Sequence, residues 1–260
     1  MIQNFLRENY IIMKQRFKFF IVIAMILLFA SQSCADEVQD LLNFYVKKFN
    51  PEKALLIISD KPDSSGMFHD IYMDLQGVHI DKLRLANLTF RMKGIQFNEP
   101  SNWKSGNVVC KSALQVLATS TILESDINKS IENKTFGKGE DHWHDVSLKI
   151  NPSGLSGKGY YNAKVGFMNL DILIDITSKL KIVKHKELWL DNPLVKINRL
   201  DLPDYITNKA LSRIQPLVNL NKFPLPLTLN TVKLSKGRAV LSSRNLPKPI
   251  EGGIKYNYSR

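Results

Sequence analysis

Apolar and polar residues alternate along most of this chain, which is the pattern of β-strands with one buried face. The clearest stretch runs over residues 170–182, where the apolar positions other than Leu173 share one parity and polar, mostly charged residues occupy the other. A single strand over residues 164–183 would measure roughly 60 Å, against a usual length of about 17–20 Å. Two strands joined near Thr177 and Ser178 are therefore the alternative to one very long strand.

A second period-two stretch covers residues 71–97, and its apolar set changes parity twice. A slip of one residue would turn that set to the opposite face of the sheet. We therefore predict β-bulges near Ala86-Asn87 and near Gly94, where an extra residue would restore the facing. Shorter strands are predicted at residues 54–58, 108–118, 146–150, 188–197, 225–234 and 239–242.

Three segments show the three- and four-residue spacing of amphipathic helices: residues 37–49, 121–134 and 202–220. In the second segment, Thr121 and Glu124 have the spacing of a capping box. In the third, Pro216 should kink or stop the helix. The pattern predicts an α+β, β-dominated fold, in which a long twisted antiparallel sheet wraps around amphipathic helices. Residues 36–245 would form one domain, and residues 246–260 a loose tail.

The first 35 residues have the order of a secretory signal peptide. Lys14, Arg16 and Lys18 form a basic region, residues 19–30 are apolar, and small or polar residues follow up to Ala35. Twelve apolar residues span roughly 18 Å as a helix, too short for a bilayer core of about 30 Å. We therefore predict cleavage after Ala35 and export to the periplasm or cell envelope.

Two alternatives concern this segment. Cys34 follows the apolar run directly, so a lipidated cysteine there is the rival to simple cleavage, although Ser31 is atypical of a lipobox. Met13 is an alternative start, because residues 1–12 add nothing to the signal. After cleavage at Ala35 the chain retains only Cys110, so no intramolecular disulfide can form, and we interpret Cys110 as a small buried residue.

The full chain carries a net charge of +12. Residues 1–35 contribute +3, from two arginines and two lysines against Glu8, which leaves +9 for the remainder. A basic exported protein can bind anionic lipid headgroups or acidic glycans. The alternative is that the charges, which form no block of five, are solvated strand faces. Nucleic acid is a poor candidate as a partner outside the cytoplasm.

The candidates for catalysis or metal binding are few. His142 and His144 would point the same way on a strand, but a zinc site normally needs three or four ligands. Asp70 and Asp74 resemble an acid–base pair, yet acidic residues alternate commonly on the wet face of a strand. We predict no enzymatic activity, no metal site and no cofactor.

Abundant apolar surface is what remains, and a lipid-binding protein requires little else. A sixteen-carbon chain could gain on the order of 12 kcal/mol from burial before costs. The alternative is a structural or interaction module of the cell envelope, whose helices fill the groove and leave nothing to bind. If a groove exists, we predict that these residues line it: Phe90, Met92, Phe167, Leu170, Ile172, Ile174, Ile206, Ala210 and Ile214.

Several stretches of the chain resemble the LmeA-like phospholipid-binding family of exported bacterial proteins. The likeness lies in DIYMDLQGVHIDKLRLANLTFRMKGIQF (residues 70–97), SDIN (125–128), LVKINRLDLP (194–203), FPLP (223–226) and LSKG (234–237). The resemblance implies an envelope protein that binds phospholipid or a membrane surface, with a fold similar to tubular lipid-binding modules. It implies no catalytic residue. The first predicted helix and the segment around Trp143 show no family pattern.

Overall fold

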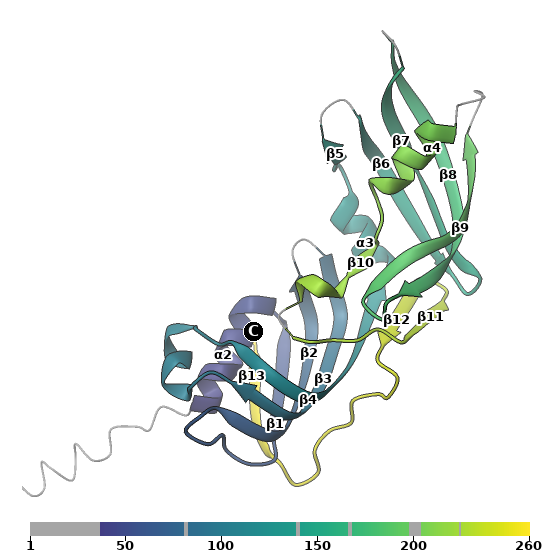
Figure 1. The fold of residues 1–260 in the computed structure, drawn as a ribbon. Helices are drawn as coiled ribbons and strands as arrows, with labels where there is room; N and C mark the ends of the chain where they lie inside the picture. The colour runs from purple at the N-terminus through teal and green to yellow at the C-terminus, as the bar shows by residue number, and fades with distance from the viewer. Residues whose placement is uncertain (1–36, 81–82, 139–140, 166–167, 198–203, 224) are drawn as a thin grey trace, which may run out of the picture. The chain divides into compact units, whose positions relative to one another are not determined.

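The computed structural model describes residues 37–80, 83–138, 141–165, 168–197, 204–223 and 225–260, and it contains two antiparallel sheets (Figure 1). The predicted signal peptide and Cys34 lie outside the described residues. The described helices are α2 (Glu37–Phe49), α3 (Glu124–Ile131) and α4 (Asp204–Ser212), with short 3₁₀ helices η1 (Pro100–Ser105) and η2 (Leu220–Lys222).

The first sheet has seven strands in the order β11-β12-β4-β3-β2-β1-β13. Their bounds are β11 (Thr231–Ser235), β12 (Arg238–Ser242), β4 (Cys110–Leu123), β3 (Leu83–Phe97), β2 (Met67–Ile80), β1 (Lys53–Ile58) and β13 (Ile254–Ser259). The second sheet has six, in the order β10-β9-β8-β7-β6-β5. Their bounds are β10 (Val218–Asn219), β9 (Glu187–Ile197), β8 (Met168–Val183), β7 (Gly154–Val165), β6 (Asp141–Asn151) and β5 (Phe136–Lys138).

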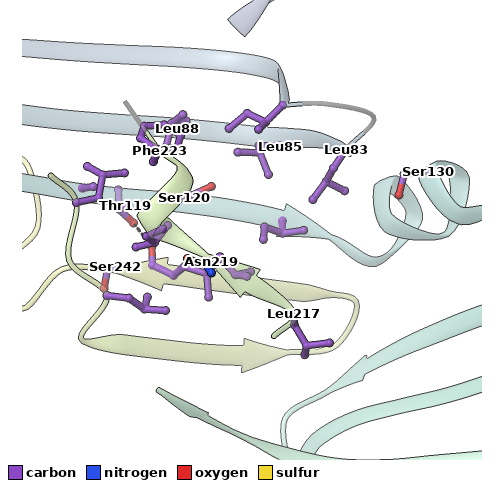
Figure 2. A pocket seen from close by; sticks show the side chains of 18 of the residues that line it. Leu83, Leu85, Leu88, Thr119, Ser120, Ser130, Leu217, Asn219, Phe223 and Ser242 are labelled. Atoms are coloured by element: carbon purple, nitrogen blue, oxygen red, sulfur yellow. Dashed lines mark hydrogen bonds between the residues drawn. The ribbon is translucent and has the colours of Figure 1, made fainter. Parts of the chain in front are cut away.

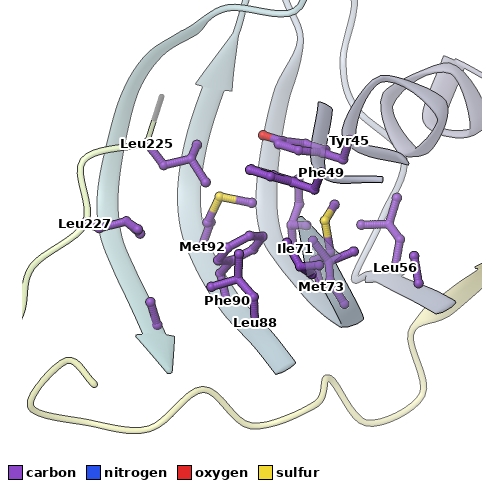
Figure 3. Close-up of a cluster of buried hydrophobic side chains, with 14 of the residues drawn as sticks. Tyr45, Phe49, Leu56, Ile71, Met73, Leu88, Phe90, Met92, Leu225 and Leu227 are labelled. Atoms are coloured by element: carbon purple, nitrogen blue, oxygen red, sulfur yellow. The ribbon is translucent and has the colours of Figure 1, made fainter. Parts of the chain in front are cut away.

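Helix α2 forms at the predicted residues and packs against the first sheet. Its apolar side chains recur every three or four residues, and five of them are buried in one cluster with residues of β1, β2 and β3. Tyr45 and Phe49 stack with ring centroids 5.9 Å apart and lie over Met92 and Ile71 of the sheet (Figure 3). Each such buried side chain contributes about 1.5–3 kcal/mol, so this face fixes the helix on the sheet.

The parity changes in β2 and β3 occur without the predicted bulges. Leu75 pairs with Leu88 and Val78 with Leu85, so the register is unchanged, yet all four side chains are buried. Both strands therefore change facing at the same level, and neither gains an unpaired residue. At Gly94 the register between β3 and β4 is also unchanged. A register shift between β3 and β4 does occur between Gln96 and Phe97, two residues after Gly94. The bulge predicted near Ala86-Asn87 is therefore wrong, and the irregularity predicted near Gly94 lies at Gln96 and Phe97.

Helix α4 covers the second sheet through a separate apolar cluster. Trp143 on β6, Tyr161 on β7 and Ile172 on β8 are buried with Ala210 of the helix. Most of the predicted long strand, residues 164–183, is one strand: β8 runs from Met168 to Val183 and continues through Thr177 and Ser178, while residues 164 and 165 end β7. The alternative break at Thr177-Ser178 corresponds to a register shift between β8 and β9 at that point.

Three predicted boundaries are wrong. Helix α3 begins at Glu124 because residues 121–123 belong to β4, and the Glu124 carboxylate accepts a hydrogen bond from the backbone N–H of Ile150 instead of forming a capping box. Helix α4 ends at Ser212, before Pro216. The tail predicted to be loose contains β13, which pairs with β1 along six residue pairs.

The fold class is confirmed as α+β and β-dominated, with antiparallel sheets covered by amphipathic helices. The sheet is divided into two where the sequence suggested one long sheet. In the part of the chain that the structure describes, none of the helices combines the length and apolar composition needed to cross a bilayer.

Candidate functional site: an apolar cavity beside helix α3

A cavity of about 430 Å³ lies between the ends of β2, β3 and β4, helix α3, and the segment that includes β10 and η2 (Figure 2). Fifteen of its 23 described lining residues are apolar, so the cavity favours hydrocarbon over polar ligands. These apolar residues are Ile80, Leu83, Leu85, Leu88, Ala118, Ile122, Ile131, Phe136, Leu217, Val218, Leu220, Phe223, Leu227, Leu229 and Leu241.

The shared change of face in β2 and β3 builds one wall of this cavity. In an uninterrupted strand, Leu85 and Leu88 would point to opposite faces, because they are three residues apart. The change of face in β3, opposite Gly77 of β2, directs the side chains of Leu85 and Leu88 into the cavity. Gly77 has a φ of +62°, and a Cβ there would lie 2.2 Å from the side chain of Glu52. Glycine is therefore required at this level of the sheet.

Several hydroxyl groups in the cavity wall are engaged with the backbone. Ser120 donates to the carbonyl of Asn87 at 3.1 Å, and Ser130 donates to the carbonyl of Ile127 at 2.7 Å. Ser243 lies 3.1 Å from the carbonyl of Ala118 and 2.7 Å from that of Asn245. These donors are directed at protein acceptors, so the wall is less polar toward a ligand than its residue types suggest.

Helix α3 forms one side of the cavity through Ser130 and Ile131, and polar contacts hold it on both flanks. Asp126 forms an ion pair with Arg84 of β3, with Nη1 and Oδ2 3.0 Å apart. Asn128 donates from Nδ2 to the carbonyl of Leu148 and accepts from its N–H, both at 2.8 Å. These bonds fix the helix between β3 and β6, and so define the cavity wall.

Lys134 is the one charged residue among the described residues that line the cavity. It follows α3 after a turn in which Asn133 has a φ of +54°. Its ammonium donates a hydrogen bond to the carbonyl oxygen of Ser130, in the last turn of the helix. A cation is favoured at this end of a helix by the helix dipole.

The residues that the sequence predicted as the lipid lining lie elsewhere. Phe90 and Met92 are fully buried in the first apolar cluster, beneath α2. Ile172, Ile174 and Ala210 are buried in the second cluster, where Leu170 and Ile214 pack against them. None of these seven lines the 430 Å³ cavity. Phe167 lies outside the described residues, and the side chain of Ile206 is not described, so the role of the predicted set stays a prediction.

Sequence reasoning missed the wall formed by residues 217–220, 223 and 227–229. It assigned residues up to 220 to a helix, whereas α4 ends at Ser212 and the chain continues through β10 and η2 along the cavity. A signal was available, because Pro216, Pro224 and Pro226 together make a continuous helix or central strand unfavourable.

The other candidate groups have structural partners. Asp70 forms a close ion pair with Arg91, at 2.7 Å, and Asp74 accepts hydrogen bonds from Asn87 and Thr89. Cys110 is partly buried, and burial raises the pKa of its thiol, which fits a packing role.

His142 and His144 do lie on the same side of β6, with ring centroids 6.0 Å apart. The Nε2 of His144 lies 3.1 Å from Asp171 and its Nδ1 lies 3.0 Å from Asp145, and these contacts raise the pKa of the imidazole. Among the described residues, no group of three or more histidine, cysteine or acidic side chains is placed to hold a metal ion.

The fold and the cavity define a class of protein: a β-rich protein with an apolar cavity, in which Lys134 is the one charged residue among the described lining residues. The sequence model of the LmeA-like phospholipid-binding family matches residues 65–243, about two thirds of the sequence. The chain therefore belongs to that family. Comparison with curated proteins and with solved structures gave no match.

Proposed function

We propose that this protein is an exported, non-catalytic phospholipid-binding protein that holds the acyl part of a lipid in the cavity beside α3. The observation that carries the proposal is the apolar lining of that cavity, in a chain of a phospholipid-binding family. Its volume of about 430 Å³ falls within the range of about 300–1,000 Å³ that is usual for small-molecule sites. The first 35 residues supply the export signal, and the cell envelope is the proposed location.

The energetics favour an acyl ligand. Each methylene group that leaves water contributes about 0.8 kcal/mol, so eight of them would gain roughly 6 kcal/mol before the cost of ordering the chain. The headgroup would stay at the opening, because most polar groups of the wall are engaged with the backbone. Basic residues elsewhere on the surface would assist contact with an anionic membrane.

Native mass spectrometry of the protein expressed with its own first 35 residues and purified after export tests this proposal. We expect a chain that begins at Asp36, together with a species heavier by one phospholipid, which lipid extraction then identifies. A chain that keeps residues 1–35 would contradict cleavage. A bare mass that persists after incubation with phospholipid, in a protein that still melts cooperatively, would contradict lipid binding.

The alternative is an interaction module of the cell envelope. It is favoured by the exposed side chains of Leu114, Leu194 and Leu246, which are 87, 70 and 59% accessible. Such residues can contact a protein partner. They come from β4, β9 and the segment after β12, and the bare-mass outcome would favour this function over lipid binding.

A further inference from the structure

The position of Lys134 suggests how the cavity could recognise the phosphate of its ligand. The backbone N–H of Lys134 donates to the carbonyl of Ile131 at 3.2 Å, so the turn after α3 folds back onto the helix. The half-buried side chain then lines the cavity, and its ammonium lies at the carbonyl of Ser130. The turn therefore places a positive charge at the wall of an apolar chamber.

The charge balance of this wall is one-sided. No aspartate or glutamate is among the described lining residues. An ammonium group has three donors, and the hydrogen bond to Ser130 occupies one of them. A phosphate oxygen is a stronger acceptor for an ammonium than a neutral carbonyl, because the bond is charge-assisted on both sides.

We propose that Lys134 binds the phosphodiester group of the lipid whose acyl chain occupies the cavity, and that it selects phosphate-bearing lipids over uncharged glycerolipids. This inference rests on the proposed function, because it assumes an acyl chain in the cavity. A choline, ethanolamine or glycerol substituent on the phosphate would extend away from the lysine toward solvent. The selectivity then arises from one ion pair, and the apolar wall contributes equally to both lipid classes.

The test compares two soluble ligands with identical chains, dioctanoyl phosphatidylglycerol and dioctanoylglycerol, by titration into the delipidated protein purified after export. Lys134→Gln removes the charge, and Lys134→Arg retains it. Lys129→Gln is the matched control, because Lys129 is an exposed lysine of the same helix that does not line the cavity. Inorganic phosphate is added as a competitor, to separate phosphate binding alone from lipid binding.

We expect wild-type protein to bind the phosphatidylglycerol about fivefold more tightly than the diacylglycerol, near the upper end for an accessible ion pair. Lys134→Gln should lose this preference and keep its affinity for the diacylglycerol, while Lys134→Arg and Lys129→Gln keep both. Inorganic phosphate at millimolar concentration should not displace the lipid. The preference should also shrink as salt is raised from about 20 to 500 mM, because ions screen the pair.

Equal affinities for the two ligands in wild-type protein would overturn the role of Lys134 and leave the lipid-binding proposal standing. If Lys129→Gln lost as much of the preference for phosphatidylglycerol as Lys134→Gln, the role of Lys134 would also be overturned, because the effect would then come from general surface charge. Displacement of the lipid by inorganic phosphate would show that phosphate binds without an acyl chain, and it would overturn the proposal that Lys134 recognises a lipid held in the cavity. Binding of neither ligand would overturn the proposed function itself. The salt series needs no substitution, so a preference unchanged by salt contradicts the proposal even if Lys134→Gln fails to fold.

Discussion

The indole Nε1 of Trp143 donates a hydrogen bond to the carbonyl oxygen of Ala210, at 3.1 Å, and joins β6 to helix α4. Both residues are buried, and the Trp143 ring lies 5.5 Å from that of Tyr161. Because successive side chains of a strand point to opposite faces, the inward position of Trp143 sends His142 and His144 to the outer face. The inward position of Trp143 thus both holds helix α4 on the sheet and places the two histidines on the outer face of β6.

Trp143→Phe should destabilise the protein by about 1–3 kcal/mol. The substitution keeps a ring in the second cluster but removes the N–H, so the carbonyl of Ala210 loses a buried partner. Chemical denaturation monitored by circular dichroism measures the change in the free energy of unfolding.

Trp189→Phe is the control for this experiment. Trp189 is only partly buried, and its indole donates to the nearby carboxylate of Glu187, at 2.9 Å on the same strand. Water can replace that donor, so the loss should be below about 1 kcal/mol. Equal losses in the free energy of unfolding in the two variants would show that the hydrogen bond to Ala210 stabilises the fold no more than an accessible one does.

Much of the fold follows from local pattern. The spacing of apolar residues in 37–49 is enough to predict α2, and the parity of Ile172 and Ile174 correctly places both on a buried face. These features depend on neighbours a few residues away in the chain, which a sequence displays directly. The changes of face near Ala86-Asn87 and Gly94 are visible too, but how the strand makes each change depends on what the paired strand does at the same level.

The cavity is harder to predict, because a filled core and an open chamber need the same apolar residues. Phe90 and Leu88 lie two residues apart on one face of β3, yet Phe90 is buried under α2 and Leu88 also lines the cavity. The difference arises from distant segments, since α2 covers one part of the sheet, and residues 217–220 and 227–229 leave space over another. Alternation along β3 contains no information on which segment will cover it.

Ser120→Phe should weaken lipid binding while the fold remains stable. Ser120 lies on β4, opposite Leu88, and its side chain lines the cavity (Figure 2). A phenyl group there would displace part of the acyl chain. Exclusion of two methylene groups forfeits roughly 1.6 kcal/mol, which is more than a tenfold loss of affinity. Titration with dioctanoyl phosphatidylglycerol measures this loss.

Ser112→Phe provides the matched control, because Ser112 is an exposed serine on the same strand and does not line the cavity. It should bind the lipid as wild-type protein does. If Ser120→Phe bound with unchanged affinity and melted at the same temperature, the lipid would have to occupy another place. Substitution of Ile172 or Ile174 would be a poorer test, because both are core residues whose truncation destabilises the fold itself.

Asn128→Ala should loosen helix α3 and, through it, the cavity. The substitution removes both hydrogen bonds between the Asn128 amide and the backbone of Leu148, and we expect a loss of about 1–3 kcal/mol in the free energy of unfolding. Hydrogen exchange of the α3 amides should accelerate, since the helix is short and would be joined to β6 chiefly by the bond between Glu124 and the backbone N–H of Ile150. Lys129→Ala, at an exposed neighbouring residue, should leave the free energy of unfolding within about 0.5 kcal/mol of wild type and the exchange of the α3 amides unchanged.

His144 should make stability depend on pH. Its pKa is raised above the ordinary value of 6.5, first by the hydrogen bond with Asp171 and then by that with Asp145, and the pKa of Asp171 is lowered in turn. Tyr160 stacks on the imidazole, with ring centroids 5.4 Å apart, Asn162 donates to Asp171, and His142 lies alongside. The pair is favourable only while the imidazole is protonated and the carboxylates are ionised.

The sign of the effect follows from linkage. A raised histidine pKa stabilises the fold fully below the unfolded pKa of about 6.5, and this contribution disappears as the pH rises through the folded pKa. The lowered pKa of Asp171 adds stability above about pH 4, which is lost as the pH falls through its folded value. The free energy of unfolding of wild-type protein should therefore exceed that of His144→Gln most between about pH 4.5 and 6. The difference should be less than about 1 kcal/mol, because the ion pair is solvent-accessible.

Thermal unfolding of wild-type protein and His144→Gln at pH 5.5 and at pH 8.5 measures this difference, and comparison at each pH cancels the contributions of other groups. His79→Gln is the control for the removal of an imidazole, because the Nδ1 of His79 lies 3.3 Å from a backbone carbonyl, that of Asn50. High salt should narrow the gap at pH 5.5, since accessible charges are screened. A gap that is wider at pH 8.5 than at pH 5.5 would show that the neutral imidazole stabilises the fold, and the ion pair with Asp171 would then have no part in it.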